Sequence, residues 1–502
     1  MTTAKLSDIF NTLIPVPTGF DRVITGMEMD SRLVKEGNLF FACPGAQQDG
    51  RKFIDAAIQN GAVAVVTAAT IATETPYLQN DIPVFPLQNI NHYMGLIAAN
   101  FYQHPAASLR IIGITGTNGK TSCSHFLASC LQRLGIPCGV IGTLGSGFHD
   151  DLQASNWTTP HALSLQKTLA DLVSRGAKAV AMEVSSHGID LGRVNGVPFE
   201  VGIFTNLTRD HLDYHGDMAT YGAVKKRLFD NPLLGQAVIN LDDDFGKTII
   251  AALAPVKPLY AFSVHHNTQT SVPLITVDNV HMGKRGLEAG VRTPWGEGEL
   301  QTALIGEFNL SNVLGVLTTL CVMGFPFVKA LASVNELTPV AGRMETVGGG
   351  EQPLIAVDYS HTPDSLEKAL QALRQHCHGR LLCVFGCGGD RDNGKRPIMA
   401  KIAEELADVV LVTDDNPRHE SPAQIVADIM RGFARPQDVI VQHDRSKAIE
   451  YIIQCANAGD CVLIAGKGAE QYQQIGDVKN PFCDIEKVNQ FLSKKLLSLQ
   501  QQ

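Results

Sequence analysis

Short apolar runs alternate with amphipathic segments along most of the chain, and this rhythm is typical of proteins that mix strands and helices. Within residues 1–90 the apolar runs predict short strands, and one segment has helical spacing. The strands lie at residues 39–42, 62–67 and 84–86, and the helix lies near residues 53–60. We expect residues 1–90 to form a small α/β domain.

A longer series of strands and helices begins near residue 108 and ends near residues 338–342, where Pro339 and Gly342 interrupt it. Its predicted strands are 109–114, 179–183, 201–205 and 237–240. The last part of the chain predicts strands at 381–385, 409–413 and 461–465, with helices near 396–406 and 423–433. Such alternation predicts largely parallel sheets, whose ligands lie at the carboxyl ends of the strands.

Composition narrows the class of protein. The chain has 502 residues, more than one hydrophobic core usually serves, so we expect three domains. Its net charge of −9 argues against general nucleic-acid binding, which needs a basic surface. The 11 cysteines are scattered and include no CxxC pair, so a reducing cytoplasm fits better than an oxidising compartment. Neither a signal peptide nor a membrane span is predicted.

The most informative motif is Gly-Ile-Thr-Gly-Thr-Asn-Gly-Lys-Thr-Ser at residues 113–122, between a predicted strand and a predicted helix. Glycines at such a junction let backbone N–H groups surround phosphate oxygens. Lys120 is then expected to reach the outer phosphates, and the Thr121 hydroxyl to face Mg²⁺. The predicted ATP contacts are Gly116, Thr117, Asn118, Gly119, Lys120, Thr121 and Ser122. A purely structural turn is the alternative, because Ile114 occupies the first glycine position of GxxxxGK[ST].

These observations predict an α/β protein of three domains. They are a small N-terminal α/β domain at residues 1–90, a central P-loop ATPase-like domain at 91–338 and a C-terminal Rossmann-like domain at 339–502.

Polar residues at later strand ends suggest metal ligands. Glu183 ends a predicted strand and offers the oxygen that Mg²⁺ prefers. The histidines His187, His211 and His215, taken alone, fit structural roles better, because hard cations favour oxygen. In the helix predicted at 219–229, Lys225 shares a face with Tyr221 and Leu228. It either belongs to a solvated basic face or reacts with carbon dioxide, giving a carbamate that ligates a second Mg²⁺.

Three loops after C-terminal strands carry groups suited to an amino acid. Arg418 follows a strand and an Asn-Pro turn, and its planar guanidinium suits a carboxylate. Arg391 and Glu470 lie after two other strands. Together they are suited to a substrate rich in carboxylates and amines, unless Arg418 is only a solvent-facing turn residue. The glycines at 386–389 lack GxGxxG spacing, so NAD binding is weakly supported.

Over nearly its whole length the chain resembles the Mur ligase family, three-domain ATP-dependent enzymes that add amino acids to the peptidoglycan precursor. Residues 113–122 resemble its phosphate loop and residues 205–216 its magnesium-histidine segment, while Lys225 falls where the family has a carbamylated lysine. The resemblance implies that Lys120, His211 and Lys225 are catalytic and that Thr121, Glu183, His211 and the Lys225 carbamate bind Mg²⁺. It also places Asn309, Arg343 and Asp358 near ATP.

Residues 415–418, Asp-Asn-Pro-Arg, resemble the signature of the members that add meso-diaminopimelate. The resemblance implies that this amino acid contacts Arg391, Asp415, Asn416, Pro417, Arg418, Gly466 and Glu470. Two N-terminal segments resemble uridine-binding loops, with contacts at Met29, Ser31, Ala46, Gln47 and Gln48. The muramoyl-peptide part of the acceptor is expected at Asn156, Thr158, Thr159, Ser185 and Arg193.

The resulting expectation is a monomeric cytoplasmic ligase that joins meso-diaminopimelate to UDP-N-acetylmuramoyl-L-alanyl-D-glutamate through an acyl phosphate, with ATP and Mg²⁺. It predicts neither a nucleic-acid nor a membrane partner. Alternatives are a lysine-adding Mur ligase, a folylpolyglutamate synthetase, or an ATP-dependent switch that ligates nothing. Arg418 argues against lysine, whose terminal ammonium it would repel.

Overall fold

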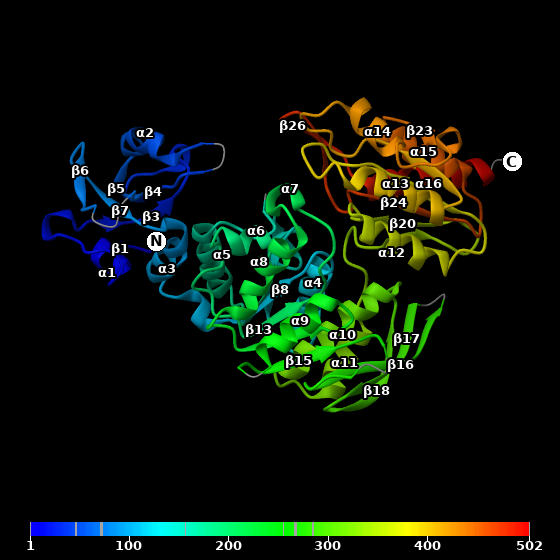
Figure 1. Ribbon diagram of the computed structural model, residues 1–502, viewed down its shortest axis with the longest axis horizontal. Coiled ribbons are helices and arrows are strands. Elements are labelled where there is room, and N and C mark those ends of the chain that lie inside the picture. Colours follow the sequence, from blue (N-terminus) through cyan, green and yellow to red (C-terminus); the bar gives the residue numbers. More distant parts are fainter. Residues whose placement is uncertain are drawn as a thin grey trace. The chain divides into compact units, whose positions relative to one another are not determined.

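The computed structural model (Figure 1) describes residues 2–45, 48–70, 74–155, 157–254, 256–265, 269–283 and 286–500. The chain is a mixture of helices and strands, as expected, and it divides into two compact units. Unit 1 comprises Met1–Thr115, Gly135–Gly202 and Val224–Gly235, and unit 2 comprises Gly116–Leu134, Ile203–Ala223 and Gln236–Gln502. Segments of the two units alternate along the chain, so this division does not test the domain boundaries predicted at residues 91 and 339. These boundaries stay predictions.

The N-terminal part of unit 1 holds a sheet of order β3-β4-β5-β7-β6. The strands are β3 Gly26–Glu28, β4 Asn38–Ala42, β5 Ala62–Ala68, β6 Tyr77–Gln79 and β7 Ile82–Leu87, and the helices are α1 Leu6–Phe10, α2 Ile54–Gln59 and α3 Ile90–Phe101. Successive residues of a strand face opposite sides of its sheet. Accordingly, Phe41 packs into one apolar cluster and Phe40 into another, so both faces of this sheet are covered.

The rest of unit 1 contains the strands that lead into the predicted acceptor residues. Parallel strands β9 Cys138–Gly142, β12 Ala179–Glu183 and β8 Arg110–Thr115 adjoin in that order. Antiparallel β10 Gly145–Phe148 and β11 Asp151–Gln153 extend β9, and the helices are α5 Ala162–Ser174 and α6 Ser186–Asp190. Strand β13 Val201–Phe204 and helix α8 Met218–Asp230 each cross a unit boundary.

Unit 2 begins with helix α4 Lys120–Arg133, which packs against α10 Glu307–Val322 and α11 Phe327–Asn335. Its first strands, β14 Gln236–Asn240 and β15 Leu259–Phe262, are parallel. The sheet then continues through β16 Leu274–Gly283, β17 Gly286–Thr293 and β18 Gly296–Thr302, with antiparallel pairing from β16 to β18. This antiparallel extension was not among the elements predicted from sequence. The remaining helices here are α7 Leu212–His215 and α9 Asp244–Leu253.

The C-terminal sheet of unit 2 has the order β19-β20-β24-β21-β22-β23. The strands are β19 Glu345–Gly348, β20 Leu354–Asp358, β21 Leu381–Phe385, β22 Val409–Val412, β23 Ile440–Val441 and β24 Cys461–Ala465. All neighbours pair in parallel except β19 with β20. The helices are α12 Pro363–Arg374, α13 Lys395–Leu406, α14 Pro422–Met430, α15 Arg445–Cys455 and α16 Asp484–Gln500, with a hairpin of β25 Tyr472–Ile475 and β26 Val478–Pro481.

Both faces of this C-terminal sheet are apolar. Along β21, Leu381, Cys383 and Phe385 join one buried cluster, whereas Leu382 and Val384 join another. Helices must therefore cover both sides, as is usual for parallel sheets. The predicted parallel sheet with crossover helices is confirmed here. Within the described residues, no helix has the length and apolar character needed to cross a membrane.

Candidate functional site

The predicted phosphate loop connects β8 to α4 through a backbone that requires glycine. Gly116 has a φ of 149°, and a Cβ there would lie 1.9 Å from the Thr205 hydroxyl oxygen. Gly119, the N-cap of α4, has a φ of 86°, and a Cβ there would lie 2.5 Å from Asn312 Oδ1. Positive φ and close packing both favour glycine over any larger residue. The strand, loop and helix context expected for a phosphate site is thus confirmed.

The Lys120 side chain lies over the loop from which it emerges. Its Nζ donates to the carbonyl oxygens of Gly116 at 2.9 Å and Thr117 at 2.8 Å. Both contacts place a cation beside backbone that is suited to an anion. The side chain of Thr121, the next residue, is buried, and its hydroxyl accepts a 3.0 Å hydrogen bond from Arg343 Nη2. Arg343, predicted near the nucleotide, therefore reaches the phosphate loop.

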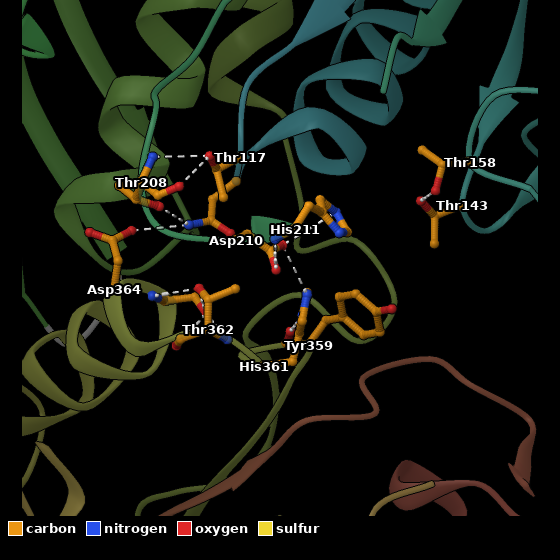
Figure 2. Close-up of polar contacts among 12 residues, drawn as sticks. Thr117, Thr143, Thr158, Thr208, Asp210, His211, Tyr359, His361, Thr362 and Asp364 are labelled. Carbon is orange, nitrogen blue, oxygen red and sulfur yellow. Dashed lines mark hydrogen bonds and ion pairs between the residues drawn. The ribbon is translucent and has the colours of Figure 1, made fainter. Parts of the chain in front are cut away.

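The segment after β13 fastens the phosphate loop from one side (Figure 2). Thr117 Oγ1 donates to the Thr208 carbonyl at 3.1 Å and accepts from the Thr208 N–H at 3.0 Å. The Asn118 N–H donates to Asn206 Oδ1 at 2.9 Å, and the Thr205 hydroxyl donates to the Asn118 carbonyl at 2.6 Å. Two consecutive loop positions, Thr117 and Asn118, are thereby held by a segment far away in sequence. This rigidity is what a preorganised phosphate site requires.

Residues at the start of α12 approach the same loop in unit 2 (Figure 2). Asn118 Nδ2 donates to Asp364 Oδ2 at 3.0 Å, and His361 Nε2 lies 3.7 Å from Asp210 Oδ2. His211 Nε2 lies 3.4 Å from the same Asp210 oxygen. Burial acts to raise the pKa of Asp210, but the contacts with His361 and His211 outweigh it and hold this pKa below its usual value. Asp210 is therefore ionised beside two imidazoles.

Asp358 and Asn309, the other predicted nucleotide residues, also lie in unit 2. Asp358 ends β20 and accepts from the Met344 N–H at 2.8 Å, which ties it to the segment that carries Arg343. Burial raises the pKa of Asp358, and the Ser360 hydroxyl and Arg343 only partly offset this effect. Asn309 is buried on α10, where it accepts a 3.4 Å hydrogen bond from Asn312 Nδ2. Asn312, whose side chain lies beside Gly119, was assigned no role from the sequence.

Within unit 1, the predicted acceptor residues gather around Glu183. Glu183 is buried, with only 1% of the residue exposed. Its carboxylate accepts hydrogen bonds from the Thr143 N–H at 2.8 Å and from the Thr143 hydroxyl at 3.1 Å. That hydroxyl also lies 3.1 Å from Thr158 Oγ1 (Figure 2). The Thr159 hydroxyl donates to the Glu183 carbonyl at 2.9 Å. Thr143 is therefore a further site residue that no motif indicated.

Ser185 and Arg193 complete this group of acceptor residues. Thr159 Oγ1 lies 3.1 Å from Ser185 Oγ, and Arg193 Nη1 donates to the Thr159 carbonyl at 2.8 Å. The Arg193 guanidinium also lies 4.7 Å from the centre of the Trp157 ring. These contacts hold an arginine in place beside two hydroxyl groups, an arrangement suited to a carboxylate or phosphate. Asn156 lies outside the described residues.

The remaining acceptor residues are in the N-terminal sheet of unit 1. Ser31 is buried, and its carbonyl accepts a 2.8 Å hydrogen bond from Asn60 Nδ2. Met29 is partly exposed, whereas Gln48 is exposed and its carbonyl accepts from the Gly45 N–H at 3.0 Å. Ala46 and Gln47 lie outside the described residues. At Ser31 and Gln48, two of the described residues of this predicted uridine site, the backbone carbonyls are therefore hydrogen-bonded within the protein.

Lys225 lies on the buried side of α8, as its spacing predicted. Only 1% of the residue is exposed, and Tyr221 and Leu228 are buried on the same helix. Its neighbour Lys226 instead reaches Asp230 Oδ1 at 2.5 Å in an ion pair near the surface. Burial of a lysine demands compensation, by a partner or by loss of its positive charge. Of the two sequence interpretations, the solvated basic face is therefore wrong for Lys225.

The predicted magnesium ligands are divided between the two units. Thr121 and His211 belong to unit 2, whereas Glu183 and Lys225 belong to unit 1. Among the described residues, no group of three or more His, Cys, Asp and Glu side chains forms a metal centre. The hydroxyl of Thr121 and the carboxylate of Glu183 nevertheless fit Mg²⁺ chemically, because this ion prefers oxygen donors.

The predicted amino-acid residues meet at the carboxyl ends of β21, β22 and β24. The Gly389 N–H, after β21, donates to the Asn416 carbonyl at 2.9 Å, and Arg418 Nη1 donates to the Gly389 carbonyl at 2.7 Å. Asn416 Nδ2 donates to Glu470 Oε2 at 2.8 Å. Arg391 is exposed on the first of these loops. Three loops distant in sequence are thus hydrogen-bonded into one cluster.

Backbone geometry accounts for two of these positions. Gly466 has a φ of 118°, and a Cβ there would lie 2.4 Å from the carboxylate of Asp415. Arg418 has a φ of 52°, an uncommon value for a residue with a side chain. The β25–β26 hairpin stabilises it, because the Arg418 N–H donates to the Gln474 carbonyl at 3.1 Å and the Arg418 carbonyl accepts from the Gly476 N–H at 2.7 Å. Arg418 is therefore a constrained residue of the cluster and not simply a solvent-facing turn residue.

Three models of known families match successive parts of the chain. They are the Mur ligase family catalytic domain at residues 23–102, the Mur ligase middle domain at residues 114–320 and the Mur ligase glutamate ligase domain at residues 342–468. The second match includes the phosphate loop, Glu183 and Lys225. The third includes Arg391, Arg418 and Gly466.

Individual proteins give longer matches. The UDP-N-acetylmuramoyl-L-alanyl-D-glutamate–2,6-diaminopimelate ligase of Coxiella burnetii is 49% identical over 472 residues, covering 94% of this chain and 96% of that protein. The ligase of the same name from Pseudomonas aeruginosa is 49% identical over 473 residues, with coverages of 94% and 96%. A solved structure bearing that ligase name matches with a TM-score of 0.70 and 34% identity, covering 99% of this chain and 100% of that one.

Proposed function

We propose that this chain, which belongs to the Mur ligase family, joins meso-diaminopimelate to UDP-N-acetylmuramoyl-L-alanyl-D-glutamate in peptidoglycan precursor synthesis. Members of this family are ATP-dependent ligases that form amide bonds. The observation that carries the choice of amino acid is the cluster of Arg418 and Asn416 after β22 with Glu470 after β24. This cluster presents both charges that the distal centre of diaminopimelate complements.

The reaction begins with activation of the D-glutamate side-chain carboxylate. One carboxylate oxygen attacks the γ-phosphorus of ATP, the bond to ADP breaks, and an acyl phosphate forms. Lys120 and the N–H groups of the phosphate loop stabilise negative charge on the transferring phosphoryl group. Bound Mg²⁺ would neutralise phosphate charge further, with Thr121, Glu183, His211 and a Lys225 carbamate as its proposed ligands.

Amide formation follows from the activated acceptor. The amine of diaminopimelate attacks the acyl carbon, phosphate leaves with the bonding electrons, and the nitrogen loses a proton. Phosphate is a far better leaving group than the oxide of a free carboxylate, which is why ATP is consumed. Arg391 is proposed to hold the carboxylate beside the reacting amine, and correct placement of two reactants supplies much of the rate gain.

Arg418 and Glu470 are proposed to bind the distal centre of diaminopimelate. A guanidinium attracts the distal carboxylate, and a carboxylate attracts the distal ammonium. Lysine has the ammonium but lacks that carboxylate, so Arg418 disfavours it. The acceptor is proposed to contact the Glu183-centred group through Thr158, Thr159, Ser185 and Arg193, with its uridine end near Met29 and Ser31.

Phosphate release measured with single omissions tests this function against a nucleotide switch. Release is expected only when the UDP-muramoyl dipeptide, meso-diaminopimelate and ATP are all present. Phosphate release that continues without either the acceptor or the amino acid contradicts ligation.

A cytoplasmic location is also proposed. All 11 cysteines are free thiols in the structure, which fits a reducing compartment.

A further inference from the structure

Lys467 is a fully buried lysine inside the amino-acid cluster. It follows Gly466 after β24, and its side chain is 0% exposed. Its Nζ donates to Asn416 Oδ1 at 2.9 Å and to Glu470 Oε2 at 2.7 Å. A buried ammonium is tolerated only where it is paired and hydrogen-bonded, and both conditions are met here. No prediction from sequence assigned a role to this residue.

Lys467 and Asn416 together orient the Glu470 carboxylate. Asn416 Oδ1 accepts from Lys467 Nζ and also from the Gln474 N–H at 2.8 Å, so its amide is fixed with Nδ2 directed at Glu470. Nδ2 then donates to Glu470 Oε2 at 2.8 Å, the oxygen that Lys467 also contacts. Both donors therefore converge on one oxygen of Glu470.

Several charged side chains of this cluster act on the Tyr472 phenol. Burial raises the pKa of the Tyr472 phenol, the Glu470 and Asp415 carboxylates raise it further, and Arg418 and Arg391 act in the opposite direction. The Tyr472 ring also lies 5.6 Å from Lys467 Nζ. Two arginines, two carboxylates and a buried lysine thus act on one small region. In such a region the sum of charges decides which ligand is preferred.

We infer that Lys467 is a positioning residue that sets the preference for an amino acid with a distal carboxylate. The positive charge of Lys467 offsets the negative charge of Glu470. Arg418 therefore attracts the distal carboxylate of the substrate without being opposed by Glu470. Without Lys467, the Glu470 carboxylate would keep the neutral Asn416 donor but lose the cation beside it, so its negative charge would repel the distal carboxylate and attract the terminal ammonium of lysine. This inference rests on the proposed function, because it concerns the same amino-acid site.

Substitutions at Lys467 test the inference through selectivity and not through activity alone. The kcat/KM values for meso-diaminopimelate and L-lysine are measured with saturating ATP and acceptor. Because hydrogen bonds to charged groups are worth more than neutral ones, we expect Lys467→Met to lower the diaminopimelate-to-lysine ratio by about tenfold or more. Lys467→Arg, which keeps the charge, is expected to restore most of the ratio. The KM for ATP should stay unchanged.

Lys479 provides a matched control. Its Nζ lies 4.4 Å from the centre of the same Tyr472 ring, but the residue is exposed. Exposed charges are screened by water and salt. We therefore expect Lys479→Met to leave both kcat/KM values within about twofold of the unmodified protein, as weak surface pairs do.

Each outcome decides the inference. Equal loss of efficiency with both amino acids in Lys467→Met, or an unchanged ratio, overturns it. If Lys467→Met does not fold, Lys467→Gln and Lys467→Arg decide, because both keep a donor and only arginine keeps the charge. Equal ratios in that pair also overturn it. Failure of the unmodified protein to use diaminopimelate would instead contradict the proposed function.

Discussion

The phosphate loop and the amino-acid cluster are built in different ways. The loop depends on backbone: Gly116 and Gly119 adopt positive φ values, and carbonyl and N–H groups make most of its contacts. The cluster depends on side chains, with Lys467, Asn416 and Glu470 hydrogen-bonded across two loops. A backbone site recognises what all reactions of a family share, the phosphates. A side-chain network can change with the substrate, so it is where selectivity belongs.

Lys120→Ala is expected to have the largest effect. Removing the cation that we propose to stabilise the transferring phosphoryl group should lower kcat by about 100- to 1000-fold or more, because such electrostatic contacts act mainly in the transition state. The loss should be equal with every amino acid tested. Steady-state kinetics and circular dichroism measure it, and near-normal turnover in a folded variant would remove the phosphate-loop assignment.

Lys225→Ala is expected to have the next largest effect. If Lys225 carries the carbamate that we propose, losing this metal ligand should reduce activity by roughly 100-fold, again regardless of the amino acid. Short carboxylic acids should restore part of the activity by supplying the missing oxygen ligand. Mass spectrometry of the intact protein under carbon dioxide checks the modification. Full activity after rigorous removal of carbon dioxide would exclude the carbamate.

Gly116→Ala tests whether the loop depends on backbone shape. The added Cβ would lie 1.9 Å from the Thr205 hydroxyl, which donates to the Asn118 carbonyl. Strained backbone costs about 1 to 3 kcal/mol, so nucleotide affinity should fall roughly 10- to 100-fold. Gly135→Ala is the control, because Gly135 also has a positive φ, 80°, but open space around its Cβ. Equal nucleotide affinity in the two variants would contradict the claim that the phosphate loop depends on its backbone shape at Gly116.

Arg418→Ala tests the side-chain cluster. A lost charge-assisted hydrogen bond costs about 1.5 to 3 kcal/mol, so kcat/KM for diaminopimelate should fall roughly 10- to 200-fold. The efficiency with lysine should not fall in parallel, because its ammonium no longer meets a positive charge. The ratio of the two kcat/KM values measures the effect. A parallel loss with both substrates would show that Arg418 does not recognise the distal carboxylate.

Asp460→Asn should change stability without changing selectivity. Burial acts to raise the pKa of Asp460, but hydrogen bonds from the Arg380 and Asn457 N–H groups and the Arg380 side chain lower it overall. A lowered pKa stabilises the fold above the unfolded-state pKa, about 3.9, and this contribution is lost as pH falls through the folded-state value. The variant should therefore unfold more easily at neutral pH and differ little in strong acid. Denaturant titrations across pH measure this.

Sequence patterns identified strands that are buried along their whole length and consist almost entirely of apolar residues. Strands β12, β21 and β24 coincide with the predicted ranges, because each is a five-residue buried run. The antiparallel strands β17 and β18 were not predicted, since their residues alternate in burial and include glycines at Gly290 and Gly298. A half-buried strand gives a weaker apolar signal than a fully buried one.

Among the site residues, those in a local motif could be predicted from the sequence, whereas those that depend on long-range contacts could not. Lys120 and Thr121 follow from a local motif, because glycine spacing and helix start are set within ten residues. Asp364 contacts Asn118 across 246 positions, and Lys467 contacts Asn416 across 51 positions. Such pairings depend on how the strands are ordered in a sheet, and no local pattern encodes that order. Thr143 was missed for a similar reason, because it meets Glu183 only through packing of β9 beside β12.

A competition experiment tests the central claim most directly. The protein is given ATP, Mg²⁺, the UDP-muramoyl dipeptide and equal concentrations of meso-diaminopimelate and L-lysine, and the products are separated by mass. A backbone phosphate site joined to a diacid-selective cluster predicts that the diaminopimelate adduct strongly predominates, with one phosphate released for each adduct formed. A predominant lysine adduct, or phosphate release without either adduct, would contradict it.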